Sequence, residues 1–132
     1  MKLFKKKEDD YDLFHKGNQL YDKKELHQAI DCFHKISDKN VRLMVDTHRM
    51  LGLCFIGLKS YESALLNFNF ALEVDPNEYQ TLIFKTKLLE ELDNRTEFRE
   101  SYATLMALRQ EEFPDEDPEK WYESIDWDMV GY

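Results

Sequence analysis

The chain has 132 residues, enough for one domain of ordinary size, and only four glycines and three prolines, as is typical of helical proteins. Its net charge of −9 is uneven, because residues 111–132 carry nine acids and one base and the other 110 residues are nearly neutral. Nucleic-acid binding needs a basic face, so the composition argues against a nucleic-acid partner.

Residues 1–9 form a short extension in which basic residues are followed by Glu8 and Asp9. These acids stand where a signal peptide needs an apolar stretch, so we expect the protein to be cytoplasmic. No apolar run approaches the roughly 20 residues that span a bilayer. The lysines at positions 5–7 are too few for stable membrane anchoring, at about 1 kcal/mol each.

A pattern of small and large apolar residues recurs every 34 or 35 positions. Its clearest copy comprises Leu51, Gly52, Phe55, Ala64, Phe68, Ala71 and Pro76. Thirty-five positions earlier, the small residues recur as Gly17 and Ala29 and the large ones as Leu20 and Phe33. Thirty-four positions later the large residues recur, but Phe98 replaces the alanine. Self-similarity of this length predicts stacked structural units.

The spacing of apolar residues predicts two helices in each unit. In the central unit one stripe comprises Leu51, Phe55 and Leu58, and the next comprises Tyr61, Leu65, Phe68 and Leu72. Between the stripes, Gly57 and Ser60 supply a break and a cap for the following helix. Pro76 ends the second helix, and Asn77 is expected to cap the next one.

The repeated glycines have a mechanical explanation. Glycine inside a helix costs roughly 0.5–1 kcal/mol relative to alanine, so Gly17 and Gly52 indicate close packing of antiparallel helices. We expect Gly52 to meet its partner helix at Ala64, with Phe33 and Phe68 filling the space between successive helices. One such pair cannot bury its apolar face alone, so the pairs must stack.

This pattern resembles the tetratricopeptide repeat. The central unit, residues 45–78, has seven residues at the family's offsets and departs in having His48 where the family usually has tryptophan. The resemblance implies an all-α fold, an α–α superhelix of antiparallel helix pairs similar to a tetratricopeptide solenoid.

The flanking units resemble the family less closely. The first, residues 10–43, has Leu13 for the tryptophan and Val41 for the proline. The third, residues 79–112, is degenerate because Phe98 stands in the alanine position. Together the three units cover residues 10–112.

The resemblance also implies a concave groove lined by the first helix of each unit. The predicted lining residues are Tyr11, Phe14, Asn18 and Tyr21, then Arg49, Leu53 and Ile56, then Gln80, Ile83 and Lys87. This apolar and aromatic floor with two cations suits a segment that has apolar anchors and an acid or two. One subgroup of the family clamps the terminal carboxylate of heat-shock chaperones. Of its five clamp positions only Asn18 fits here, so no such clamp is expected.

Residues 113–132 form an acidic tail. Asp117-Pro118-Glu119 is typical of a helix start, and Trp121, Ile125 and Met129 recur at i+4. A short helix here would cap the last unit. Alternatively, residues 125–128 resemble the acidic tryptophan peptides that some tetratricopeptide domains bind, which would make the tail a ligand for a partner, for its own groove or for a second copy.

Residues that carry chemistry are sparse. The four histidines include no i, i+4 pair, and His27 and His34 lie about 10 Å apart along a helix, too far to share a metal. The glycines are isolated, and the acids at 115–117 lack the glycine of a calcium loop. Cys32 and Cys54 lack metal-ligand spacing and would pair only in an oxidising compartment. We therefore expect no enzyme activity, cofactor or metal.

The sequence predicts a non-catalytic protein–protein interaction module, an adaptor or scaffold, that binds a peptide segment in its groove. One alternative is a dedicated cytoplasmic chaperone for a client or secretion substrate, which would keep an otherwise insoluble client in solution. Another is a structural subunit that self-associates through its groove or its acidic tail, which light scattering would detect.

Overall fold

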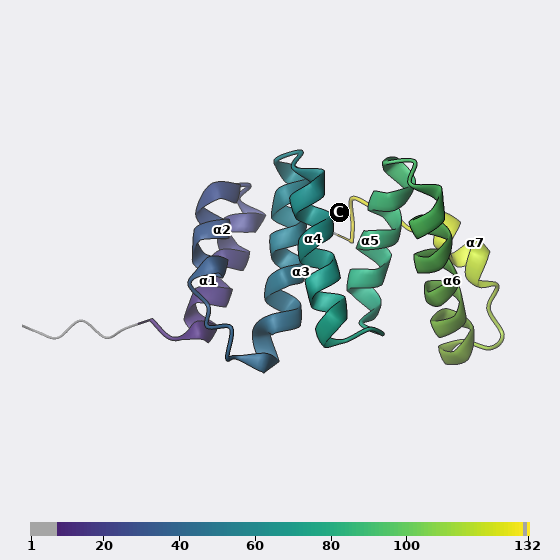
Figure 1. Cartoon of the computed structure of the whole chain (residues 1–132), viewed down its shortest axis with the longest axis horizontal. Helices are drawn as coiled ribbons and strands as arrows, with labels where there is room; N and C mark the ends of the chain where they lie inside the picture. Colours follow the sequence, from purple (N-terminus) through teal and green to yellow (C-terminus); the bar gives the residue numbers. More distant parts are fainter. Residues whose placement is uncertain (1–7, 131) are drawn as a thin grey trace, which may run out of the picture.

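The computed structural model describes residues 8–130 and 132, and all regular secondary structure among them is helical (Figure 1). In this part of the chain the helices are α1 (Asp10–Asp22), α2 (Leu26–His34), α3 (Val41–Gly57), α4 (Tyr61–Val74), α5 (Tyr79–Glu91), α6 (Arg95–Glu112) and α7 (Pro118–Glu123). The prediction of an all-α fold is confirmed for these residues. The lysines at positions 5–7 lie outside them.

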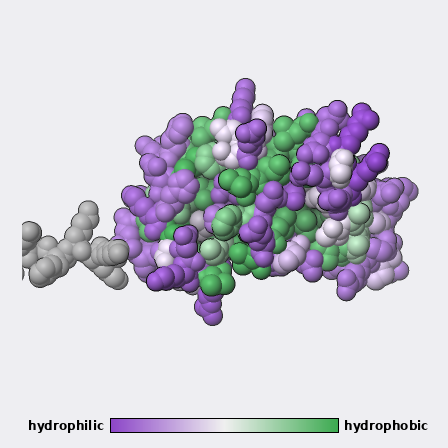
Figure 2. Space-filling model, viewed as in Figure 1, coloured by the Kyte–Doolittle hydropathy of each residue, from purple (hydrophilic) through white to green (hydrophobic). Residues whose placement is uncertain are grey.

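The helices stand side by side in a row, and each packs against its neighbours in the chain (Figure 1). Apolar residues gather over the middle of this row, where α3 and α4 lie, and hydrophilic residues cover the end formed by α6 (Figure 2). Among the described residues, no helix combines the length and the apolar character needed to cross a membrane.

Three turns of similar geometry join α1 to α2, α3 to α4, and α5 to α6. Each contains one residue with positive φ: Lys24 at 61°, Lys59 at 60° and Asp93 at 53°. In each turn the following residue donates its backbone N–H to the carbonyl five positions earlier, at 2.9, 2.8 and 3.1 Å. The three positive-φ residues are 35 and 34 positions apart, so the backbone conformation repeats with the same period as the sequence pattern.

The predicted break between the two stripes is present, because α3 ends at Gly57 and α4 begins at Tyr61, and the left-handed conformation falls on Lys59. Two expected caps differ in the structure. Ser60 stands at the N-cap of α4, but its side chain makes no capping bond to that helix. Asn77 was wrongly predicted to cap the next helix: Glu78 is the cap of α5, and its carboxylate accepts the backbone N–H of Thr81 at 2.7 Å.

The glycines do allow close helix packing, as predicted. A Cβ atom on Gly17 would lie 2.6 Å from Phe33 Cε1, and one on Gly52 would lie 2.3 Å from Phe68 Cε1. Both rings are buried, and Ala64 is completely buried as well. In each of the first two pairs a phenylalanine ring therefore occupies the space that a side chain at the glycine position would need.

The third pair is joined by a different contact. Thr86 replaces the glycine, and its Oγ1 lies 2.6 Å from Ser101 Oγ in a buried hydrogen bond. Phe98, at the alanine position, is half-buried and stacks on Tyr102 with 5.3 Å between ring centroids. A hydrogen bond thus connects α5 and α6, whereas ring packing connects the helices of the first two pairs.

The predicted helix in the tail is confirmed but is shorter than the i+4 spacing suggested. Asp117 caps α7 by accepting the N–H of Glu119 at 3.0 Å, and Pro118 is its first residue. The helix buries Tyr122 against α5 and α6. It ends at Glu123, so Met129 lies outside it and is 84% exposed.

Both cysteines are free and buried, Cys32 in α2 and Cys54 in α3. Burial raises the pKa of the Cys54 thiol to about 12. Because the thiolate is the reactive form, we expect alkylation of Cys54 at pH 8 to be on the order of a thousandfold slower in the folded chain than in guanidinium.

Peptide mapping of iodoacetamide-treated protein measures this rate for each cysteine. Without reductant, guanidinium should release two titratable thiols per chain. A single rate for Cys54 in both conditions, or no free thiol after unfolding, would contradict the buried, unpaired state.

Candidate functional site

The ten predicted groove residues come from α1, α3 and α5. Six of them line one cavity of about 430 Å³: Phe14, Asn18, Tyr21, Arg49, Leu53 and Gln80. Val130 of the tail also borders this cavity. The geometry therefore brings together residues from all three helices and adds a residue from the far end of the chain.

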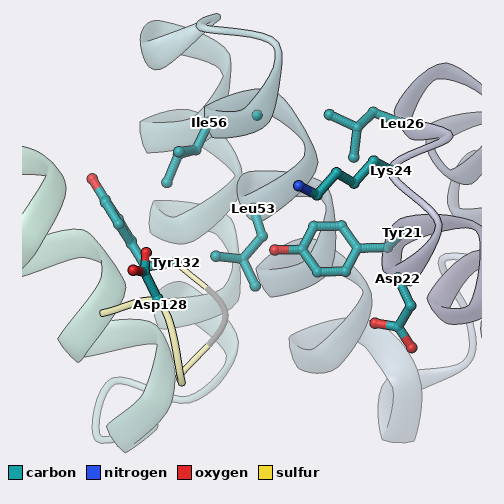
Figure 3. Close-up of a pocket in the computed structure, with 9 residues that line it drawn as sticks. Tyr21, Asp22, Lys24, Leu26, Leu53, Ile56, Asp128 and Tyr132 are labelled. Carbon is teal, nitrogen blue, oxygen red and sulfur yellow. The ribbon is translucent and has the colours of Figure 1, made fainter. Parts of the chain in front are cut away.

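A larger adjacent cavity has a volume of about 740 Å³ (Figure 3). Leu53 and Ile56 of α3 form its floor, and Tyr21 lies on the wall formed by the end of α1 and the turn to α2. On the opposite side, Asp128 and Tyr132 of the tail form the other wall (Figure 3). The tail is thus part of the surface that encloses this space.

The remaining predicted residues lie elsewhere. Tyr11 is 51% exposed and borders neither of these cavities. Ile83 packs between the core of α3, α4 and α5 and the core beneath α7. Lys87 lies under the tail, with its Nζ atom 5.0 Å from the ring centroid of Trp127.

Arg49 is already paired within the protein. Its guanidinium lies 2.8 Å from the Asp46 carboxylate and 3.2 Å from that of Glu78, and its side chain is only 13% exposed. Glu78 also caps α5, so this network connects α3 to α5. Arg49 therefore holds the two helices together and does not supply the unpaired cation that the sequence suggested.

Asn18 faces the smaller cavity from α1. Its Oδ1 atom is buried and has no hydrogen-bond partner among the described residues. A carbonyl oxygen in this position can accept a hydrogen bond from a backbone N–H of a bound segment.

Tyr132 is anchored on α5 by two contacts. Its ring stacks on Phe84 with 6.2 Å between centroids and an interplanar angle of 24°. Its hydroxyl donates a hydrogen bond to Glu91 at 2.8 Å. Burial and this hydrogen bond raise the pKa of the Tyr132 hydroxyl, so it stays protonated and remains a donor.

Trp127 and Tyr132 lie together because the chain between them turns. The N–H of Tyr132 donates to the carbonyl of Trp127 at 3.1 Å, and the N–H of Val130 donates to the carbonyl of Asp126 at the same distance. The centroids of the two rings are 5.7 Å apart. The turn therefore presents two aromatic side chains to the same part of α5.

A continuous series of ring contacts runs from the core through the tail and back to α6. In order, it comprises Phe68, Phe84, Tyr132, Trp127, Tyr122, Tyr102 and Phe98. Sequence reasoning missed Phe84 and Tyr132 as site residues. Phe84 lies between Gln80 and Lys87 at helical spacing, so it could have been included, whereas nothing local marks Tyr132.

Within residues 8–130 and 132, no three His, Cys, Asp or Glu side chains cluster as metal ligands. His48, which replaces the tryptophan of the repeat pattern, stacks on Phe70 and has its Nδ1 atom 3.0 Å from Asn67 Oδ1. These contacts give His48 a structural role between α3 and α4.

The sequence matches no protein-family model, and no curated protein is significantly similar to it. The function of the site is therefore inferred from its own geometry.

Proposed function

We propose that this protein is a non-catalytic, cytoplasmic interaction module that binds a peptide segment of another protein along α1, α3 and α5. The fold we assign to it is a superhelix of three helix pairs similar to the tetratricopeptide repeat. The repeated turns and the two glycine–phenylalanine contacts support this assignment.

The proposal depends on one observation: the surface of α5 that faces the cavities already binds a short segment of the same chain, residues 124–130 and 132, through aromatic side chains. Aromatic rings that fill such surfaces dominate the binding energy of most protein interfaces. Beside this segment, the floor at Leu53 and Ile56 remains available to a ligand. The dedicated chaperone and the self-associating subunit stay predictions from the sequence.

A peptide library displayed on phage and selected against the full chain tests the proposal. We expect the selected peptides to bind at least tenfold more weakly to an Ile56→Glu variant, because a carboxylate would enter the apolar floor of the groove. Fluorescence anisotropy with synthetic copies of these peptides measures the change in Kd.

The matched control is Leu66→Glu, the same change on α4 at a side chain that is 65% exposed and borders neither cavity. Its Kd values should equal those of the unmodified chain. Peptides that bind Ile56→Glu and Leu66→Glu equally well, or a selection that enriches none, would reject the groove as the binding site. Thermal melts confirm that both variants remain folded.

A further inference from the structure

The tail segment, residues 124–130 and 132, contacts a helix that lies far earlier in the sequence, α5. Glu91 accepts the Tyr132 hydroxyl at 2.8 Å across 41 positions, and the neighbouring Glu90 accepts the Tyr122 hydroxyl of α7 at the same distance. Two consecutive residues of α5 thus hold α7 and the tail segment side by side. These bonds bring the last described residue onto the surface assigned to partner binding.

The tail segment makes its ring contacts through two side chains. Trp127 and Tyr132 are half-buried, as is Ile125 next to α7, whereas Asp126, Asp128 and Met129 are exposed. None of the buried residues of the three core clusters lies in this segment, whose side chains pack against two of those clusters from outside. The tail segment is therefore docked on a completed core, and its departure would expose Phe84 without dismantling a helix pair.

The chemistry of this docking site is specific. Phe84 offers a ring face to Tyr132, and the ammonium group of Lys87 faces the ring of Trp127. Lys87 also pairs with Glu91 at 3.8 Å, so a cation and an acid lie next to the two rings. The segment that this surface binds is aromatic and carries its acids, Asp126 and Asp128, in exposed positions.

Assuming that the groove is the binding site, we propose that the tail segment is a tethered competitor that the partner must displace. The displacing segment carries two aromatic residues about five positions apart, flanked by carboxylates, and it takes the places of Trp127 and Tyr132 on Lys87 and Phe84. The tail then leaves the groove while α7 stays in place.

The segment in the groove belongs to the same chain and not to a second copy. Tyr122 and Tyr132 bind adjacent residues of α5, so the nine residues between them need to span only a short distance. A ligand attached through so short a link has an effective concentration of about millimolar or more, which exceeds that of a free copy in dilute solution.

The test uses full-length variants and a labelled peptide of residues 124–132 with both ends blocked. In the tail-release variant, Trp127→Ala with Tyr132→Ala, the tail loses both aromatic anchors. The apparent affinity for the peptide is proportional to the fraction of molecules whose groove is free of the tail. The tail-release variant should therefore bind the peptide at least tenfold more tightly than the unmodified chain. Tyr132→Ala alone should give a smaller increase.

Met129→Ala is the matched control in the tail, because this side chain is 84% exposed, and it should bind the peptide as the unmodified chain does. Adding Lys87→Glu to the tail-release variant should abolish peptide binding, whereas adding Lys85→Glu should not. Residues 85 and 87 lie about 200° apart around the helix, so Lys85 points away from the groove.

Hydrogen exchange separates displacement from binding beside the tail. When peptide binds the unmodified chain, the N–H groups of Val130 and Tyr132 should lose protection, because their bonds within the tail turn are released. Continued protection at saturation would mean that the peptide binds next to the tail, and would overturn the inference.

Equal affinity of the peptide for the unmodified chain and the tail-release variant would also overturn it, and so would failure to bind either chain. Both results leave the proposed function intact if the Ile56→Glu change still weakens binding of the library peptides. A dimer in light scattering that dissociates in the tail-release variant would assign the tail to a second copy and refute the intramolecular contact.

Discussion

Replacing Phe68 with alanine is expected to lower the free energy of unfolding by about 3–5 kcal/mol. The ring is completely buried, lies directly over Gly52 of α3 and stacks on Phe84 of α5 with 6.2 Å between centroids. Its removal would leave a cavity among three helices, and the backbone on either side is too constrained to fill it. Urea denaturation followed by circular dichroism at 222 nm measures the loss.

Phe70→Ala is the matched control, since it removes the same side chain from the same helix. Phe70 is 44% exposed, and its described ring contact is with His48. We expect this variant to lose about 1 kcal/mol, the usual contribution of one partly exposed aromatic contact. Equal losses at positions 68 and 70 would show that Phe68 does not connect the helices as described.

Gly52→Ala is expected to destabilise the protein by about 1–3 kcal/mol, although alanine is the better helix former. The new Cβ atom would lie 2.3 Å from Phe68 Cε1, and the ring cannot retreat because Phe84 lies on its other side. The same denaturation experiment measures the effect. A neutral or stabilising result would mean that the two helices can separate at little cost.

Gly57→Ala provides the comparison, because its Cβ atom would also meet a neighbour, Leu26 Cδ1, at 2.5 Å. That atom is the end of a flexible, half-buried side chain that can rotate away, so we expect a change within about 0.5 kcal/mol. Combining Gly52→Ala with Phe68→Leu should cost at least about 1 kcal/mol less than the two single losses together. Strict additivity would contradict a direct steric conflict.

The helix pairs could be predicted from sequence because they depend on local periodicity and on contacts at fixed offsets. Gly52 and Phe68 are only 16 positions apart, and the pattern contains both. The turns could not be predicted in the same way. Positive φ is uncommon outside glycine, and neither Lys24 nor Lys59 signals it.

The helix in the tail could also be predicted at its start, because Asp117 and Pro118 act on their own helix. Its end could not. If the helix continued to residue 132, Trp127 and Tyr132 would point about 140° apart, and both rings could not reach α5 together. Contacts with Phe84, Lys87 and Glu91 therefore favour a turn over further helix.

Six of the ten residues predicted for the groove line one cavity, and their role in binding stays a prediction. The resemblance assigns residues to the inner helices, and the smaller cavity does combine Phe14, Arg49 and Gln80 from three of them. It carries no information about a segment outside the repeats that covers α5. Nor does it indicate that Arg49 is neutralised by Asp46 and Glu78, because that network depends on side-chain geometry.

The order of elements along the chain has a consequence for biosynthesis. Helices that contact mainly their neighbours in sequence can form pair by pair as the chain emerges from the ribosome, starting from the N-terminus. The surface of α5 around Phe84 and Lys87 is synthesised before Trp127 and Tyr132, which contact it. In a nascent chain this surface therefore stays uncovered until those two residues have emerged.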